Sequence, residues 1–310
     1  MKLTSEYPHY TCPFGTFNKA QEVAVPFLDQ DVNLVVSFPT AGGKTVLAEC
    51  AFAYHLKTCK DSKVVYVSPL RSLSAERYDD WCANEQFSPY GVLLSTGDAL
   101  ASKEDFEKHR MLILTNESFD AKTRNQTHHE WLRDTACVAF DEAHLLGQDG
   151  RGDSLEVSLV RFTRINPDAR LIFLSATMEN VAEISEWVKS LNGKRTIKVK
   201  SKWRPTKLKT KLHKLVVEEG DKSQAVKARK VREILMAIPS YEKVLVFVHS
   251  KSFGTDLAKM LRREGIACEF HNASLSRANR EKIEKAFNDP DSGLNVLVST
   301  STLSAGVNIG

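Results

Sequence analysis

Short apolar segments rich in β-branched residues alternate with segments of helical periodicity along this chain. Uninterrupted apolar runs of this length are typical of strands buried on both faces, which occur in parallel sheets covered by helices. The predicted strands are 33–38, 63–68, 91–96, 110–115, 136–141 and 170–175, and helical segments such as 46–57, 154–165 and 180–191 lie between them. In the last helix, Trp187 shares a face with other apolar residues and is expected in the core. The alternation predicts an α/β fold.

The same alternation resumes after a basic segment. Helices are predicted over about 223–238, 252–264 and 276–288, and strands at 243–250, 266–271 and 294–300. The run KVLVFVHS at 243–250 is apolar enough to predict a buried strand. Two α/β domains are therefore expected, over residues 1–203 and 204–310.

The basic segment spans residues 194–214 and contains ten Lys or Arg and no Asp or Glu, although the formal net charge of the whole chain is only +4. Two interpretations stay open. Lys198 and Lys200 share one face of a predicted strand, and lysines deter the pairing of exposed sheet edges. The same charges would also form a phosphate-binding face beside a nucleic acid.

Composition excludes several classes of protein. Hydrophobic residues make up 42% and charged residues 26%, which is typical of a globular protein with a sizeable core. No apolar stretch approaches the roughly 20 residues of a membrane span, and the N-terminus does not resemble a signal peptide. The six cysteines include no C-x-x-C pair, so no metal or redox centre is indicated. A cytoplasmic location is expected, or a nuclear one in a eukaryote.

Residues 37–45, SFPTAGGKT, join a predicted strand to a predicted helix. Glycines in such a loop let backbone N–H groups and the helix N-terminus approach an anion closely. In the phosphate-loop pattern G-x-x-x-x-G-K-[ST], Lys44 reaches the β- and γ-phosphates and the Thr45 hydroxyl binds Mg²⁺. Phe38 stands where the first glycine of that pattern is usual.

FDEAH, residues 140–144, closes another predicted strand. A carboxylate at a strand end holds Mg²⁺ in P-loop enzymes, which assigns that role to Asp141. The adjacent Glu142 can orient and deprotonate an attacking water. Two adjacent acids that begin an exposed turn would explain FDEAH by itself. That explanation would not account for SFPTAGGKT and FDEAH both lying at the ends of predicted strands, in this order. Together they predict a nucleoside-triphosphate site.

An ordered set of segments resembles the motifs of superfamily-two DExH helicases of the Ski-type branch, which includes archaeal and eukaryotic DNA repair helicases and related RNA helicases. FPTAGGKT, DEAH and SAT (175–177) match motifs I, II and III, and motif I of this branch often lacks the first glycine. The other matching segments are PFGTFNKAQ (13–21), YVSPLRSLSAERYDDW (66–81), STGD (95–98), LTNESFD (114–120), DEAHLLGQDGRGDSLE (141–156), VLVFVHSKS (244–252), FHNASLSRANREKIEKAF (270–287) and VLVSTSTLSAGVNIG (296–310). Asn116, Ser118, Asn272 and Gly310 depart from the commoner residues.

The resemblance implies two RecA-like parallel-sheet domains in tandem, of the P-loop NTPase class, with ATP and Mg²⁺ as cofactors. It implies an ATP-dependent helicase whose two domains close over a single nucleic-acid strand and step along it. Single-stranded or forked nucleic acid is the expected partner, without a membrane. DNA is favoured because LLGQDGRGDSLE is closer to the DNA repair members, and the implied polarity is 3′ to 5′. The printed sequence stops before the branch's motif VI, so the second domain is expected to be incomplete.

The resemblance also assigns roles residue by residue. The implied catalytic residues are Glu142, Asp141 and Lys44; the nucleotide-binding residues are Gln21, Thr40, Ala41, Gly42, Gly43, Lys44, Thr45, Gly306 and Asn308, with Thr45 and Asp141 on the metal. The implied nucleic-acid contacts are Arg71, Thr96, Asp98, Thr115, Arg277, Thr300 and Thr302, and the residues that couple the two activities are His144, Ser175 and Thr177. Ser, Thr and Asp at strand ends are usually caps or turn residues, and that alternative stays open for the nucleic-acid set.

Two other functions stay open. One is an RNA helicase of the same branch. The other is a nucleic-acid-binding scaffold module whose ATP site does not hydrolyse, which the missing motif VI favours and the intact Lys44, Thr45, Asp141 and Glu142 disfavour. An unrelated P-loop kinase or GTPase would leave the second α/β unit unexplained.

Overall fold

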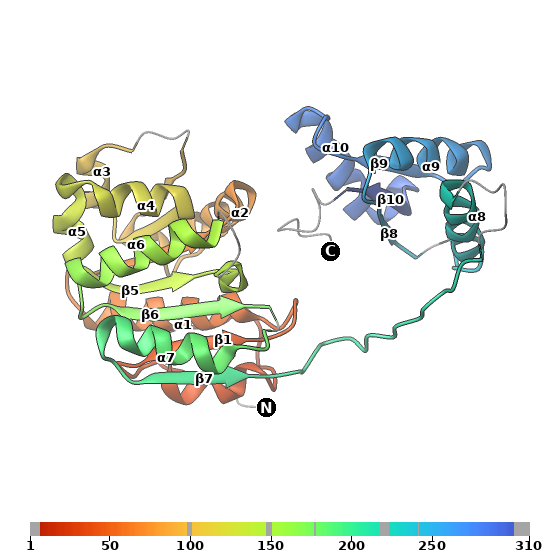
Figure 1. The fold of residues 1–310 in the computed structure, drawn as a ribbon. Helices are drawn as coiled ribbons and strands as arrows, with labels where there is room; N and C mark the ends of the chain where they lie inside the picture. The colour runs from red at the N-terminus through yellow and green to blue at the C-terminus, as the bar shows by residue number, and fades with distance from the viewer. Residues whose placement is uncertain are drawn as a thin grey trace. The chain divides into compact units, whose positions relative to one another are not determined.

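The computed structural model describes residues 7–97, 101–146, 151–176, 178–216, 223–240 and 242–300, without the side chains of Arg151 and Arg277. The chain divides into two compact units, Met1–Leu208 and Lys209–Gly310 (Figure 1). Within the described part of the chain, no helix is long and apolar enough to cross a membrane.

The first unit is built on a seven-stranded parallel sheet with the strand order β3-β4-β2-β5-β6-β1-β7. Its strands are β1 (Asn33–Ser37), β2 (Lys63–Ser68), β3 (Val92–Ser95), β4 (Met111–Thr115), β5 (Thr135–Phe140), β6 (Arg170–Ser175) and β7 (Thr196–Lys200). Its helices are α1 (Lys44–Thr58), α2 (Arg71–Ala83), α3 (Lys103–Lys108), α4 (Asn116–Arg124), α5 (His129–Arg133), α6 (Arg151–Ile165) and α7 (Val181–Asn192). The predicted parallel sheet is confirmed.

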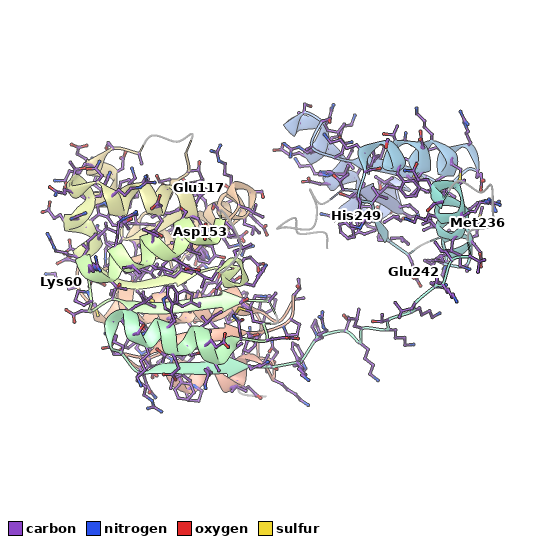
Figure 2. The ribbon with its side chains drawn as sticks, viewed as in Figure 1. Lys60, Glu117, Asp153, Met236, Glu242 and His249 are labelled. Atoms are coloured by element: carbon purple, nitrogen blue, oxygen red, sulfur yellow. The ribbon has the colours of Figure 1, made fainter. Side chains whose placement is uncertain are left out.

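Helices cover both faces of this sheet, which explains the uninterrupted apolar strands. Successive residues of β1 point to opposite faces: Leu34 and Val36 lie in one core with α1, and Val35 lies in the other, with α6 and α7. Side chains fill both sides of the sheet (Figure 2). Trp187 packs against the second core, with its ring centroid 6.5 Å from that of Phe173, as its helical spacing predicted.

A buried arginine ties the N-terminal segment to the sheet. Arg170, at the start of β6, is completely buried, and its guanidinium donates hydrogen bonds to the carbonyl oxygens of Phe27, Leu28 and Val32 at 2.6–2.8 Å. A buried guanidinium is tolerated only when its nitrogens find acceptors, and here each of the three nitrogens donates to a carbonyl oxygen. The segment before β1 is therefore held in register with β6.

The basic segment includes β7, an edge strand of the sheet that pairs with β1. Val199 is buried there, whereas Lys198 and Lys200 are exposed, which agrees with the edge-protection interpretation for these two lysines. Residues 204–214 are exposed and form neither helix nor strand. Their side chains project from an extended stretch of chain (Figure 2), so the phosphate-binding interpretation stays open for them.

The second unit contains a three-stranded parallel sheet with the order β8-β10-β9. Its elements are α8 (Ser223–Met236), β8 (Val244–Phe247), α9 (Lys251–Arg263), β9 (Cys268–His271), α10 (Arg277–Asn288) and β10 (Val296–Ser299). The prediction of a buried strand at 243–250 is wrong in one respect. β8 is an edge strand of the described sheet, and Leu245 and Phe247 on one of its faces are 38% and 54% exposed. An apolar run alone does not reveal whether both faces of a strand are covered.

A buried histidine makes the stability of the first unit depend on pH. His55 of α1 is 7% exposed, and neither ring nitrogen has a hydrogen-bond partner among the described residues. Burial, together with the nearby charge of Arg170, lowers the pKa of His55 from 6.5 to about 3. Below pH 6.5 the unfolded chain therefore binds a proton that the folded chain does not, and stability falls as the pH falls towards 3.

We expect His55→Leu to flatten the acid side of the stability curve. Between pH 8 and pH 5 the free energy of unfolding of the unchanged chain should decrease by up to about 1.4 kcal/mol per pH unit from this group. Urea unfolding at several pH values measures that slope in both proteins. Their difference at pH 8, where the imidazole is neutral in both states, isolates the packing effect. Equal slopes would contradict the prediction.

Candidate functional site

The loop between β1 and α1 has the backbone of an anion-binding turn. It leaves the sheet at Phe38, whose N–H donates to the carbonyl oxygen of Ser175 at 3.1 Å. Ala41 and Gly43 then adopt positive φ angles of 61° and 73°, and α1 begins at Lys44. Alternation of left-handed and ordinary residues before a helix N-terminus is typical of loops that surround an anion with N–H groups.

Both glycines of this loop are required by close contacts. A Cβ atom on Gly42 would lie 2.8 Å from the carbonyl oxygen of Pro39, and one on Gly43 would lie 2.4 Å from Nε2 of Gln21. No larger residue fits either position without moving its neighbours. The shape of the loop therefore favours glycine at both positions.

Two side-chain amides from the N-terminal segment hold the loop. Gln21 Nε2 donates to the Gly43 carbonyl oxygen at 3.0 Å, and Asn18 Nδ2 donates to that of Gly42 at 3.2 Å. Gln21 Oε1 in turn accepts the Asn18 N–H at 2.9 Å. The predicted contact of Gln21 with an adenine edge stays a prediction. Its carboxamide has a second N–H and a second lone pair, beyond those used in these contacts, with which it could bind such an edge. Sequence reasoning did not identify Asn18.

A pair of carboxylates follows β5, across β6 from the loop. The Asp141 N–H donates to the Val67 carbonyl oxygen at 2.8 Å and continues the pairing of β5 with β2. Its Oδ2 accepts the Tyr66 hydroxyl at 2.5 Å, and its Oδ1 accepts the Glu142 N–H at 2.9 Å. Glu142 adopts φ 50°, a left-handed conformation that is uncommon for a residue with a Cβ atom and turns the chain sharply at this point.

Electrostatics connect Lys44 with both carboxylates. Burial raises the pKa of Asp141, while the Tyr66 hydrogen bond and the charge of Lys44 lower it. The pKa of Glu142 is lowered, first by His144, whose Nδ1 lies 3.2 Å from Glu142 Oε2, and further by Lys44. The charge of Lys44 thus favours the ionised form of both acids, and its Nζ donates to the Phe38 carbonyl oxygen at 3.5 Å.

The segment after β6 is attached to the end of β1. Ser37 Oγ donates to the Ala176 carbonyl oxygen at 3.3 Å and accepts the Met178 N–H at 3.0 Å. Ser175 is completely buried, and its Oγ has no partner among the described residues. Thr177 lies outside them. Ser37 was not predicted, because a serine at a strand end gives no sign of what its hydroxyl contacts.

The oxygen atoms predicted as metal ligands fit Mg²⁺ better than a metal that is bound by protein side chains alone. No group of three or more His, Cys, Asp or Glu in the described ranges could hold a metal ion. Oxygens of Thr45 and Asp141 remain as predicted ligands. Mg²⁺ is usually bound through one or two protein oxygens together with substrate phosphates and water, so this sparse set is compatible with a magnesium–nucleotide complex.

The predicted nucleic-acid residues are in varied positions. Arg71 begins α2 and is exposed. Its Nη2 lies close to Gly97, since a Cβ atom added to Gly97 would be 2.9 Å from it, and Gly97 follows the half-buried Thr96. Thr115 is 1% exposed and caps α4, since its Oγ1 accepts the Ser118 N–H at 3.2 Å. Thr300 is also buried. Asp98, Thr302, Gly306, Asn308 and the side chain of Arg277 lie outside what the structure describes.

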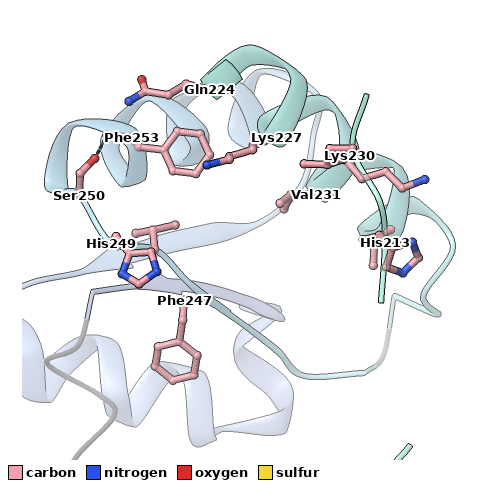
Figure 3. A pocket seen from close by; sticks show the side chains of 12 residues that line it. His213, Gln224, Lys227, Lys230, Val231, Phe247, His249, Ser250 and Phe253 are labelled. Atoms are coloured by element: carbon pink, nitrogen blue, oxygen red, sulfur yellow. Dashed lines mark hydrogen bonds between the residues drawn. The ribbon is translucent and has the colours of Figure 1, made fainter. Parts of the chain in front are cut away.

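The second unit has a separate pocket of about 450 Å³ between α8, the end of β8 and the preceding segment (Figure 3). Lys227, His249 and His213 contribute polar groups to it, and Phe253 and Phe247 contribute rings. This pocket contains none of the predicted nucleotide-binding residues.

Two features of this parallel sheet define the P-loop class of proteins. A glycine-containing loop joins β1 to a helix, and two adjacent carboxylates follow β5. Residues 18–184 match the DEAD/DEAH box helicase family, and residues 226–310 match the helicase conserved C-terminal domain. The chain belongs to the DEAD/DEAH box helicase family. The resemblance to superfamily-two helicases is thereby confirmed.

Curated relatives include two named DNA helicases. The chain is 30% identical over 319 residues to the ATP-dependent DNA helicase Hel308 of Thermoplasma volcanium, a match that covers 93% of this chain and 45% of that protein. It is 29% identical over 332 residues to the ATP-dependent DNA helicase MER3 of Saccharomyces cerevisiae, covering 96% of this chain and 27% of that one. The chain thus spans less than half the length of these relatives.

Solved structures share the tandem fold. The Mycobacterium smegmatis helicase Lhr bound to ssDNA and AMP-PNP has a TM-score of 0.73 and 23% identity, covering 99% of this chain and 42% of Lhr. The S. cerevisiae protein Dbp5 bound to RNA and ADP BeF3 has a TM-score of 0.70 and 19% identity, covering 99% of this chain and 78% of Dbp5. The predicted fold class, two RecA-like units in tandem, is confirmed.

We expect Gly43→Ala to disturb the loop more than its backbone strain alone would. The matched control is Gly193→Ala, because Gly193 has φ 72° but nothing within 4 Å of an added Cβ. Both variants should lose about 1–2 kcal/mol of stability through left-handed strain. Only Gly43→Ala should also displace Gln21 and weaken binding of ATP, measured by calorimetry. Equal ATP affinity in the two variants would contradict the close contact seen here.

Proposed function

We propose that the protein is an ATP-dependent DNA helicase that translocates 3′ to 5′ on single strands. One observation supports this most strongly: β1 and β5 both pair in parallel with β6, so the loop after β1 and the acids Asp141 and Glu142 after β5 lie at the same edge of the sheet. Two relatives named as ATP-dependent DNA helicases support the choice of substrates.

In this proposal the loop binds the phosphates of ATP. Backbone N–H groups around the positive-φ residues Ala41 and Gly43 surround the phosphate oxygens, and the Lys44 ammonium neutralises part of their charge. Thr40 and Gly42 complete the loop. Gln21 binds the adenine edge through the carboxamide N–H and oxygen lone pair that remain available beside its contact with Gly43.

Thr45 and Asp141 hold Mg²⁺, which when bound neutralises phosphate charge as the terminal phosphate is transferred. Glu142 orients the attacking water and accepts its proton. The His144 ring beside Glu142 favours the ionised carboxylate, the form that can accept a proton. Because His144 and the buried Ser175 adjoin this centre, they are proposed to connect hydrolysis with movement on the strand.

The proposed strand contacts begin with Arg71, whose exposed guanidinium suits a phosphate. Thr96 and Asp98 on the first unit, and Arg277 and Thr302 on the second, complete the set of proposed contacts. Thr115 and Thr300 are left out of it, because both are buried and Thr115 caps α4. The single strand is DNA in this proposal, and no partner protein is proposed.

Two substitutions should separate binding from chemistry. Lys44→Ala should weaken binding of Mg-ATP by about tenfold or more, because it removes a charge-assisted contact with phosphate. Glu142→Gln should leave that affinity nearly unchanged and lower DNA-stimulated ATP hydrolysis by about a hundredfold or more, the usual effect of losing a general base. Calorimetry measures the affinity and phosphate release measures turnover.

Unchanged DNA-stimulated hydrolysis in Glu142→Gln would refute the assigned chemistry. Stimulation by single-stranded RNA but not by DNA would favour an RNA helicase. ATP binding without any hydrolysis in the unchanged protein would favour the scaffold function.

The exposed basic residues should contribute to strand affinity through phosphate contacts. Neutralising Lys207, Lys209 and Lys211 to Gln should reduce the slope of log affinity against log salt by about 2, since each single-strand phosphate contact contributes about 0.7. The matched control neutralises Lys57, Lys60 and Lys108, three exposed lysines of the first unit. Fluorescence anisotropy with labelled single-stranded DNA gives the slope. An equal change in both triple variants would leave the basic segment without a specific role.

A further inference from the structure

Tyr66 is the one aromatic residue in the otherwise aliphatic strand β2, KVVYVS. It is 1% exposed and pairs with Ala139 of β5, two residues before Asp141. A buried tyrosine hydroxyl needs a partner, and here the partner is the Oδ2 atom of Asp141, at 2.5 Å. The ring therefore reaches from the core of the sheet to the carboxylate at its edge.

The ring of Tyr66 is itself fixed by packing. The Trp81 indole of α2 lies edge-on to it, with centroids 5.1 Å apart and an interplanar angle of 82°. Trp81 Nε1 donates to Glu49 Oε1 of α1 at 2.8 Å, and Tyr10 donates to the other oxygen of Glu49 at 2.9 Å. The Tyr66 hydroxyl is thus held by a buried group of side chains from the N-terminal segment, α1 and α2.

Asp141 then has a donor on each carboxylate oxygen. Tyr66 binds Oδ2, and the Glu142 N–H binds Oδ1 at 2.9 Å. An ionised carboxylate has about four lone-pair positions, so these two contacts determine its plane and leave a position on each oxygen. The contacts thus leave room for a metal while preventing rotation of the group.

We infer that Tyr66 is a positioning residue that orients the Asp141 carboxylate for Mg²⁺. The inference rests on the proposed function, in which Asp141 is a metal ligand. Groups that hydrogen-bond a metal-binding side chain typically change metal affinity by about 10–100-fold when they are removed. Tyr66→Phe removes only the hydroxyl and keeps the ring against Trp81.

The matched control is Tyr10→Phe. Tyr10 is also a buried tyrosine that donates its hydroxyl to a buried carboxylate, but its partner is Glu49 rather than Asp141. A loss of stability common to both variants therefore reports the general effect of removing a buried hydroxyl. The part of the effect of Tyr66→Phe that exceeds the effect of Tyr10→Phe reports the orientation of Asp141.

The experiment titrates Mg²⁺ into the 310-residue chain with the non-hydrolysable analogue AMP-PNP and follows analogue binding by calorimetry. Tyr66→Phe should raise the Mg²⁺ concentration at half-maximal effect by about tenfold or more. Its binding of AMP-PNP in EDTA should match that of the unchanged chain. Tyr10→Phe, whose hydroxyl is separated from Asp141 by Glu49, Trp81 and Tyr66, should shift the midpoint far less than Tyr66→Phe does, and thermal unfolding should confirm that all three proteins are folded.

A midpoint in Tyr66→Phe equal to that of the unchanged chain would overturn the inference and leave the proposed function standing. Equal losses in Mg²⁺ and in EDTA would overturn it as well, since they would indicate a general effect on the fold. If the unchanged chain bound AMP-PNP without any dependence on Mg²⁺, the proposed function would fail first. Trp81→Phe, which keeps the hydroxyl but loosens the ring, should shift the midpoint in the same direction by less.

Discussion

Parallel pairing of β1, β6 and β5 is the constraint on which the candidate site depends. In a parallel sheet the carboxyl ends of neighbouring strands lie at one edge, so the segments that follow them converge there. Ser37 of β1 pairs with Ser175 of β6, and Phe140 of β5 pairs with Phe173 of the same strand. The phosphate loop, the acidic pair and the segment after β6 are thereby brought together from three distant parts of the chain.

Buried polar groups then stabilise this edge. The Phe38 N–H and the Ser37 hydroxyl bind the main chain that follows β6, and Gln21 binds the main chain of the loop. Each contact satisfies a group that would otherwise be buried without a partner, at a penalty of about 1–3 kcal/mol. The loop is consequently supported from both sides by hydrogen bonds within the protein.

The buried tyrosines connect this edge to the core. Tyr66 and Tyr10 each donate to a carboxylate, one at the candidate site and one on α1, and Trp81 contacts both the Tyr66 ring and the carboxylate on α1. Aromatic residues suit this position because the ring packs in the core while the polar end reaches a partner. The site is therefore supported by the core of the first unit, to which α1, α2 and β2 all contribute.

The sequence by itself determined the order of strands and helices, because burial on both faces of a parallel sheet requires continuous apolar runs. It also determined the residue types of the loop after β1 and of the acidic pair Asp141 and Glu142. It could not reveal that Tyr66, Asn18 and Ser37 support those residues, since a hydrogen bond between distant positions leaves no periodic pattern. It also misjudged β8, whose apolar run does not show that one face is exposed. Those features were decided by the tertiary structure, because strand order and register set which side chains meet.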